Sequence, residues 1–392
     1  MGWNKVAIVG VGMIRFGELF DKSYDQMIEE AYLAAIEGVD KGITPKEIQA
    51  GWYGTARGFL HGQEALGGAS LTGSIALAGI PSTRVENGCP TGADTFRNAC
   101  LGVASGVYDV VLALGAEKMR DKSTTEGLLS RATQGHPIIN RGETAPALFT
   151  FYAVRHMHEF GTTKEQMALV AVKNHANGAL DPYAHHRAAI CVEDVYKSPM
   201  VAYPFNVLDC CPQTDGAAAI ILCRADLAAK YTDKPVYVAG FGLGTDYLHF
   251  HEKKTFTEFA ATVSAAKQAY AMAGITPSQI DLAEVHDCFS IVELIDYEDL
   301  GFCEKGEGGK LVERGETERD GRIPVNVSGG LLSKGHPLGA TGLAQLSELY
   351  WHLRNEAGER QVEIRRGYGL QHNVGGMGLA NAAVTILSNH TN

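Results

Sequence analysis

Short runs of apolar and β-branched residues alternate with longer stretches of helical periodicity along most of the chain. Residues 5–12 and 235–242 are two such runs, and each predicts a buried strand because apolar or small side chains fill consecutive positions. A helical pattern follows each run, and we expect the first helix to stop at Gly42 and the second at Gly274. Strands that alternate with helices indicate an α/β protein with a mixed or parallel sheet that carries helices on its faces.

The two runs open related halves of the chain. Residues 5–12 match residues 235–242 at an offset of 235 − 5 = 230, and Gly42-Ile-Thr-Pro45 recurs as Gly274-Ile-Thr-Pro277 at an offset of 274 − 42 = 232. A nearly constant offset indicates an internal duplication. Two duplicated α/β halves that pack together predict a five-layered α-β-α-β-α body.

A stretch within the first half, from about residue 120 to residue 201, follows neither copy. It is rich in histidine and proline and lacks sustained strand patterns, so we interpret it as an insertion of helices and loops over the first half, a lid or loop domain above a ligand site. The predicted domains are therefore a first half at 1–119, the insertion at 120–201, a return strand of the first half at 202–230 and a second half at 231–392.

Composition and charge exclude several functions. The net charge is −11 without a Lys/Arg-rich run, so no electrostatic footprint for nucleic acid is present. Apolar stretches stay well below the ~20 residues that span a bilayer, and we expect no membrane association and a cytoplasmic location. The eight cysteines form no C-x-x-C spacing, so neither a metal site nor a redox pair is expected.

Cys89 stands where a strand-like segment turns into a helix, in the sequence Asn87-Gly-Cys-Pro-Thr-Gly92. Backbone N–H groups and the positive end of a helix dipole stabilise a thiolate at such a place, and the pKa of a cysteine there falls from ~8.5 to roughly 3.5–7.5. The alternative is a small buried cysteine in a turn, because free cysteines are commonly core residues. This segment alone leaves both interpretations open.

Three further motifs lie in the last hundred residues. His286-Asp-Cys288 places a histidine and a thiol at i and i+2, which on a strand would face the same way. Gly335-His-Pro-Leu-Gly339 holds His336 among small residues that let a substrate approach closely. Gly375-Gly376 follows Gln371-His-Asn373 in the last motif. Each motif singly also fits ordinary packing or hydrogen bonding, and their joint occurrence with Cys89 favours a catalytic site.

Together these segments resemble the thiolases, and most closely the sterol carrier protein 2-type thiolases of the single-domain bacterial and archaeal branch. The resemblance covers essentially the whole chain and rests on five segments: 87–92, 115–119, 286–289, 335–342 and 371–373. It implies a thiolase fold and an acyl-CoA C-acyltransferase that cleaves or forms a 3-oxoacyl-CoA through an acyl-enzyme.

The resemblance also implies roles for individual residues. Cys89 would carry the acyl group, His336 would accept its proton, and Cys288 would replace the second cysteine of other thiolases as the acid/base. His286 and His336 would bind the thioester oxygen, and the N–H of Cys89 with a backbone N–H near Val374 would form a second oxyanion hole. The residues assigned to support that hole are His372, Val374 and Gly375.

No permanently bound cofactor is implied, and coenzyme A is the co-substrate. The expected partners are acyl-CoA, coenzyme A, a second copy of the chain in a homodimer or tetramer, and a small OB-fold subunit with a zinc ribbon. Two alternatives stay open: another condensing enzyme of this fold (a ketoacyl or hydroxymethylglutaryl-CoA synthase, or an aldolase-like relative), and a non-catalytic acyl-CoA-binding subunit. A dinucleotide-binding enzyme is rejected, because Arg15 and Asp246 stand where the last glycine of G-x-G-x-x-G belongs.

Overall fold

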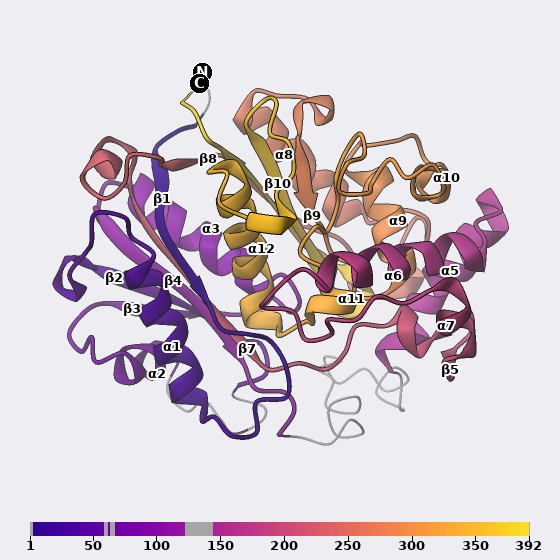
Figure 1. The fold of residues 1–392 in the computed structure, drawn as a ribbon, viewed down its shortest axis with the longest axis horizontal. Coiled ribbons are helices and arrows are strands. Elements are labelled where there is room, and N and C mark those ends of the chain that lie inside the picture. Colours follow the sequence, from indigo (N-terminus) through magenta and orange to yellow (C-terminus); the bar gives the residue numbers. More distant parts are fainter. Residues whose placement is uncertain (1–2, 59–61, 63–66, 122–143, 392) are drawn as a thin grey trace.

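The computed structural model describes residues 3–58, 62, 67–121 and 144–391 (Figure 1). Its large sheet has nine strands in the order β3-β2-β4-β7-β1-β8-β11-β10-β9. The first half supplies β1 Val6–Met13, α1 Tyr24–Glu37, β2 Ala50–Gly54, α2 Gly68–Ser74, β3 Ser82–Val85, α3 Thr91–Ala104, β4 Val110–Glu117 and β7 Gly216–Arg224. The second half supplies β8 Val236–Thr245, α8 Ala260–Ala273, β9 Leu282–Glu284, α9 Ser290–Asp299, α10 Gly308–Glu313, α11 Gly330–Lys334, α12 Leu338–Leu353, β10 Tyr368–Gly375 and β11 Asn381–Ser388.

The strand order displays the duplication. Read outward from the centre, the first half runs β1-β7-β4-β2-β3 and the second runs β8-β11-β10-β9. The two half-sheets join where β1 and β8 pair antiparallel over only two residue pairs, Ala7 with Tyr237 and Ile8 with Val236. The counterpart of β3 is reduced in the second half to a single parallel bridge between Ala283 and Val325. Both copies also share a short 3₁₀ turn after Thr44 and after Thr276, each with a capping box.

Three hydrophobic cores separate five layers, as the duplication predicts. One core packs α1 and α2 on the first half-sheet, with Met27 and Leu71 fully buried. The central core packs α3 and α12 between the two half-sheets, through Phe96 and Leu346. The third packs α8 and α9 on the second half-sheet. The helices α3 and α12 are therefore enclosed between the halves (Figure 1).

The glycines of β1 and β8 serve helix packing. A Cβ on Gly12 would lie 2.2 Å from the backbone nitrogen of Ala35 in α1, and a Cβ on Gly242 would lie 2.0 Å from the carbonyl oxygen of Ala265 in α8. The same close approach of helix to strand occurs in both halves. Helix packing therefore explains the Gly-x-Gly pairs of β1 and β8, and nucleotide binding is not needed to explain them.

The first helix ends earlier than predicted. α1 stops at Glu37 with Gly38 as its C-cap, whereas we expected Gly42 to end it. Gly38 closes the helix because a side chain there would lie 2.7 Å from the carbonyl oxygen of Val11. α8 ends as predicted at Gly274, which adopts the left-handed conformation that glycine tolerates.

The described part of the insertion packs on the second half, whereas we expected it over the first. It contains α5 Ala145–Phe160, α6 Lys164–Gly178, α7 Val192–Lys197 and the ribbon of β5 Met200–Ala202 with β6 Phe205–Asn206. Its buried residues join the core of α8 and α9, and these helices lie beside α9, α10 and α11 (Figure 1). The apolar faces of α5 and α6 are buried in that core. Residues 122–143, including His136, belong to the predicted insertion and lie outside the described residues.

Candidate active site

Two helix N-termini of the central layer meet in the middle of the molecule. Cys89 precedes α3 and His336 precedes α12, and each is followed by a proline that is the N-cap of its helix. The local sequences also agree, because Cys89-Pro-Thr-Gly-Ala93 matches His336-Pro-Leu-Gly-Ala340. The duplication therefore places the thiol and the imidazole at equivalent positions of the two halves.

Glycines in both helices allow this meeting. A Cβ on Gly92 of α3 would lie 2.6 Å from the carbonyl oxygen of Gly339, and a Cβ on Gly342 of α12 would lie 2.3 Å from the backbone nitrogen of Ala93. We predicted that the small residues around His336 admit the substrate. For Gly339 and Gly342 the structure shows a different use. Backbone of α3 fills the space beside Gly342, and backbone of β2 and β4 fills the space beside Gly339.

A loop from the second half completes the site. β9 ends at Glu284, so His286 and Cys288 lie in the loop before α9 and not on the strand that we used to orient them. The sulfur of Cys89, one ring nitrogen of His286 and one ring nitrogen of His336 all lie within 4.8 Å of one another. The two imidazole rings meet edge to face, with centroids 5.0 Å apart. The structure thus brings these three residues together.

Hydrogen bonds define the proton position on His336. Its Nδ1 lies 2.8 Å from the Thr341 hydroxyl oxygen, and that hydroxyl donates to the carbonyl oxygen of Pro337. Because the Thr341 proton is used in this way, Nδ1 is the donor to Thr341 and Nε2 keeps its lone pair. Nε2 is buried and has no hydrogen-bond partner among the described residues. Burial lowers the pKa of His336 to about 3, which keeps this ring a neutral acceptor.

A chain of amides gives His286 the opposite tautomer. The Gln345 side chain donates to the carbonyl oxygen of Val285, which leaves its Oε1 as an acceptor. The Asn373 amide donates to that oxygen at 2.9 Å, and its nitrogen also lies 3.4 Å from Nδ1 of His286. Nδ1 is therefore the acceptor and the proton lies on Nε2. At Nε2, His336 therefore presents a lone pair and His286 presents an N–H.

Cys288 carries a buried thiol next to the two histidines, His286 and His336. Burial raises its pKa well above the usual value, and the neighbouring thiols of Cys211 and Cys89 add to the shift. Its backbone carbonyl accepts a hydrogen bond from Cys211 at 3.0 Å. A thiol held in its protonated form is suited to give a proton, not to attack a carbonyl.

The strand β10 reaches the site through different residues than predicted. His372 faces away from Cys89: Nε2 lies 2.9 Å from the Thr262 hydroxyl of α8, and Nδ1 lies 3.2 Å from the Asp296 carboxylate of α9. Side chains alternate along a strand, so its neighbour Asn373 faces the site instead. Val374 is fully buried in the core of α8 and α9, so its backbone alone can serve the site.

Gly375 touches the nucleophile directly. A Cβ at this position would lie 2.3 Å from Cβ and 2.7 Å from the sulfur of Cys89. Backbone at the end of β10 therefore forms a wall beside Cys89; the predicted support of an oxyanion hole by Gly375 stays a prediction. Reasoning from the sequence missed Asn373, Gln345 and Thr341. Side chains alternate between the two faces of a strand, and this alternation between His372 and Asn373 was the signal that could have identified Asn373.

Asp287 joins the catalytic loops. Its carboxylate accepts from the backbone N–H groups of Leu331 and Leu332 at the start of α11, and from the Asn174 amide of α6. It thereby connects the His286–Cys288 loop to the segment that leads to His336. Its neighbour Phe289 packs on Phe149 of α5, with ring centroids 4.5 Å apart. The insertion therefore contacts the loop that carries His286 and Cys288.

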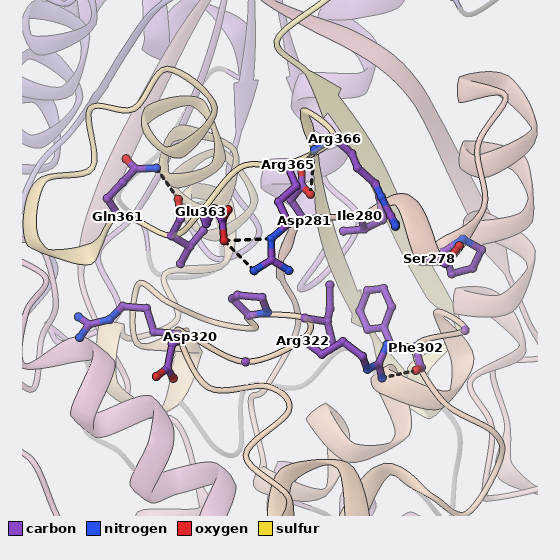
Figure 2. A pocket seen from close by; sticks show the side chains of 17 residues that line it. Ser278, Ile280, Asp281, Phe302, Asp320, Arg322, Gln361, Glu363, Arg365 and Arg366 are labelled. Carbon is purple, nitrogen blue, oxygen red and sulfur yellow. Dashed lines mark hydrogen bonds and ion pairs between the residues drawn. The ribbon is translucent and has the colours of Figure 1, made fainter.

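A cavity of about 660 Å³ lies at the opposite end of β9 and β10 (Figure 2). Arginines and carboxylates line it, among them Arg322, Arg365, Asp281 and Glu363. Arg365 pairs with Glu363, and the Asp281 carboxylate accepts from backbone N–H groups, including that of Gly367. Its lining contains no histidine or cysteine, so the chemistry of the molecule is concentrated around Cys89.

Comparison with known proteins agrees with this geometry. Residues 6–198 match the thiolase N-terminal domain and residues 242–389 the thiolase C-terminal domain-like family. The chain is 46% identical to an acetyl-CoA acetyltransferase of Methanothermobacter thermautotrophicus over 98% of this chain and 99% of that protein. It is 37% identical to sterol carrier protein 2 of Bos taurus over 95% of this chain and 70% of that protein.

Among solved structures, the Ltp2-ChsH2(DUF35) aldolase superposes with a TM-score of 0.85 at 24% identity, over 99% of both chains. At that identity the likeness speaks for the fold alone. The fold inferred from the sequence motifs is confirmed. No helix in the described ranges is both long and apolar enough to cross a bilayer.

Proposed function

Because this chain belongs to the thiolase family and is an acyltransferase of that family, we propose that Cys89 carries an acyl group between coenzyme A thioesters. The reaction is the cleavage of a 3-oxoacyl-CoA by coenzyme A, or its reverse. The observation that carries the proposal is the meeting of a thiol with two imidazole nitrogens of opposite protonation within 4.8 Å. Coenzyme A acts as co-substrate, and no permanently bound cofactor is part of the proposal.

The cleavage begins at the lone pair of His336. Nε2 accepts the thiol proton of Cys89, and the resulting thiolate attacks the 3-keto carbon of the substrate. Negative charge develops on the keto oxygen, and the proposed donors to it are backbone N–H groups of Cys89 and of the end of β10; the close approach of Gly375 to Cys89 supports this assignment. The bond between C2 and C3 then breaks, which leaves an acyl group on the sulfur and an acetyl-CoA enolate.

The enolate takes its proton from Cys288. The Nε2–H of His286 donates to the thioester oxygen, where the enolate charge lies, and the Cys288 thiol delivers a proton to carbon. The proton held by His336 then passes to the Cys288 thiolate, which restores both groups. Coenzyme A attacks the acyl group on Cys89, and His336 accepts the coenzyme A thiol proton and returns it to the Cys89 sulfur as the sulfur leaves. In the synthetic direction the same steps run backwards, so Cys288 removes a proton from acetyl-CoA.

We propose acetoacetyl-CoA as the first substrate to test, since the relative from Methanothermobacter is an acetyl-CoA acetyltransferase. Residues 120–201 are proposed to shape the acyl pocket, because Phe149 of α5 packs on Phe289 and Asn174 of α6 bonds to Asp287. A homodimer or tetramer is proposed, in a cytoplasmic location. A small OB-fold subunit with a zinc ribbon is proposed as a further partner, since the aldolase of similar fold, Ltp2-ChsH2(DUF35), is named for two components of which one is a DUF35 protein.

The test is to find the acylated residue. The purified protein is incubated with acetoacetyl-CoA and longer 3-oxoacyl-CoAs, and the adduct is located by intact mass and peptide mapping. An adduct on Cys89 that free coenzyme A removes would support the proposal, and Cys89→Ala should show none. Absence of an adduct both in the purified protein and in native cell extract would contradict covalent catalysis. An adduct in the extract alone would indicate a required partner subunit.

A further inference from the structure

Cys89, His286 and His336 have the composition of a metal site as well as of a catalytic one. Their sulfur and two nitrogens lie within 4.8 Å of one another. Ligands around a tetrahedral zinc ion are about 3.3–3.6 Å apart, given Zn–S of about 2.3 Å and Zn–N of about 2.0–2.1 Å. Side-chain movements on the order of 1 Å would therefore bring the three atoms onto one ion.

The two imidazoles are prepared for a ligand. Their Nε2 atoms are buried, and neither has a hydrogen-bond partner among the described residues. His336 already donates its Nδ1–H to Thr341, which is the arrangement that orients a metal-bound histidine. His286 needs one tautomer change, in which its proton moves from Nε2 to Nδ1. That change sets an N–H of His286 against the Asn373 amide nitrogen 3.4 Å away, so the Asn373 side chain must turn away from Nδ1.

The donor set selects the type of ion. One thiolate and two neutral imidazoles suit borderline-soft ions such as Zn²⁺ and Co²⁺, whereas Mg²⁺ and Ca²⁺ prefer oxygen ligands. Three protein ligands leave a fourth position open for water. The ion would occupy the space that the acyl group takes on Cys89.

We propose that Cys89, His286 and His336 bind one Zn²⁺ ion per chain and that the bound ion reversibly inhibits the enzyme. The Cys89 thiol loses its proton to solvent, a Zn–S bond forms and no group is oxidised or reduced. The sulfur lone pair is then held by the metal and cannot attack a carbonyl, while His336 is lost as a base. This binding uses the residues of the proposed function but does not require that the reaction occurs.

The direct test is a titration of the metal-free full-length protein with Co²⁺, followed by absorption spectroscopy. A tetrahedral thiolate site gives a sulfur-to-cobalt band in the near ultraviolet and d–d bands in the visible, saturating at one ion per chain. Zn²⁺ should bleach these bands. Cys89→Ser should lose the near-ultraviolet band. His336→Ala removes a ligand and should weaken Co²⁺ binding by more than the roughly 10–100-fold that loss of an outer-shell partner costs.

Matched controls separate this site from other thiols. Cys191→Ser changes an exposed cysteine and Cys303→Ser a half-buried one, and both should bind Co²⁺ as the native protein does. Circular dichroism and thermal unfolding would verify that Cys89→Ser is folded. Bands that persist in folded Cys89→Ser, or that never appear in the native protein, would overturn the proposal.

Acylation provides an independent check. An enzyme that carries an acyl group on Cys89 should bind no Co²⁺, and micromolar Zn²⁺ should block acylation until a chelator is added. An acyl adduct without Co²⁺ bands would refute the metal site and leave the proposed function intact. Co²⁺ bands without any acyl adduct would support the metal site and contradict the proposed function.

Discussion

The two halves of this molecule use one local structure for different chemistry. In the first half, a Cys-Pro-x-Gly-Ala segment opens α3 and exposes part of a thiol. In the second half, a His-Pro-x-Gly-Ala segment opens α12 and buries an imidazole that is 5% exposed. The duplication thus created two facing helix N-termini, and a single difference of residue type separates the proposed nucleophile from the proposed base. The second half then added the loop of His286 and Cys288.

The largest effect should come from removing either member of the pair. Cys89→Ala should abolish the acyl adduct, whereas His336→Ala should keep the nucleophile and lower kcat by about 10²–10⁴-fold, the range for a lost general base. Rapid-quench measurement of acylation with acetoacetyl-CoA distinguishes the two. Cys191→Ser serves as the control. Acylation of Cys89→Ala at a second cysteine would show that the two halves are not divided in this way.

The packing of α12 on the first half-sheet can be broken without changing Cys89 or His336. Gly339→Ala would place a methyl group 2.3 Å from the carbonyl oxygen of Gly54, so we expect a loss of about 1–3 kcal/mol in the free energy of unfolding. Gly73→Ala in α2 meets no atom within 4 Å and should stabilise by up to about 1 kcal/mol, the usual helical preference. Urea unfolding measures both. Equal effects would show that Gly339 is not required for helix packing.

The amide chain of the second half offers a finer test. Asn373→Ala removes the donor to Nδ1 of His286, so the proposed catalytic tautomer loses its preference and kcat should fall about fivefold, the equivalent of one hydrogen bond at ~1 kcal/mol. KM should change little. The neighbouring variant His372→Ala removes a side chain from the other face of β10 and should lower stability while kcat per folded molecule stays near native. A reversed pattern would contradict the assignment of the two faces.

The last test concerns acid stability. Burial lowers the pKa of His336 and of His372 to about 3, and that of His175 to about 4. The unfolded chain binds protons at these residues below pH ~6.5, whereas the folded chain stays neutral there, so folding free energy is lost as the pH falls from about 6.5 toward 4. Urea midpoints at pH 7.5, 6 and 5 should decrease in that order. A midpoint that is constant over this range would contradict the neutral buried histidines.

Local patterns in the sequence determined much of the fold. Apolar runs placed β1 and β8, the repeated Gly-Ile-Thr-Pro segment marked equivalent turns, and Gly274 ended α8 where predicted. These features depend on residues close together in the chain, so they are readable without the tertiary structure. The motifs around Cys89 and His336 also identified the two residues that meet.

Only the tertiary structure decided which side chains face them. His372 and Asn373 are adjacent in sequence, and the position of β10 between two helix layers determines that Asn373 reaches the site while His372 packs against α8 and α9. The role of Gly339 depends on strands β2 and β4, which lie more than two hundred residues away in the chain. The insertion was placed over the wrong half for the same reason: helical periodicity shows that a face is apolar, but not which surface will cover it.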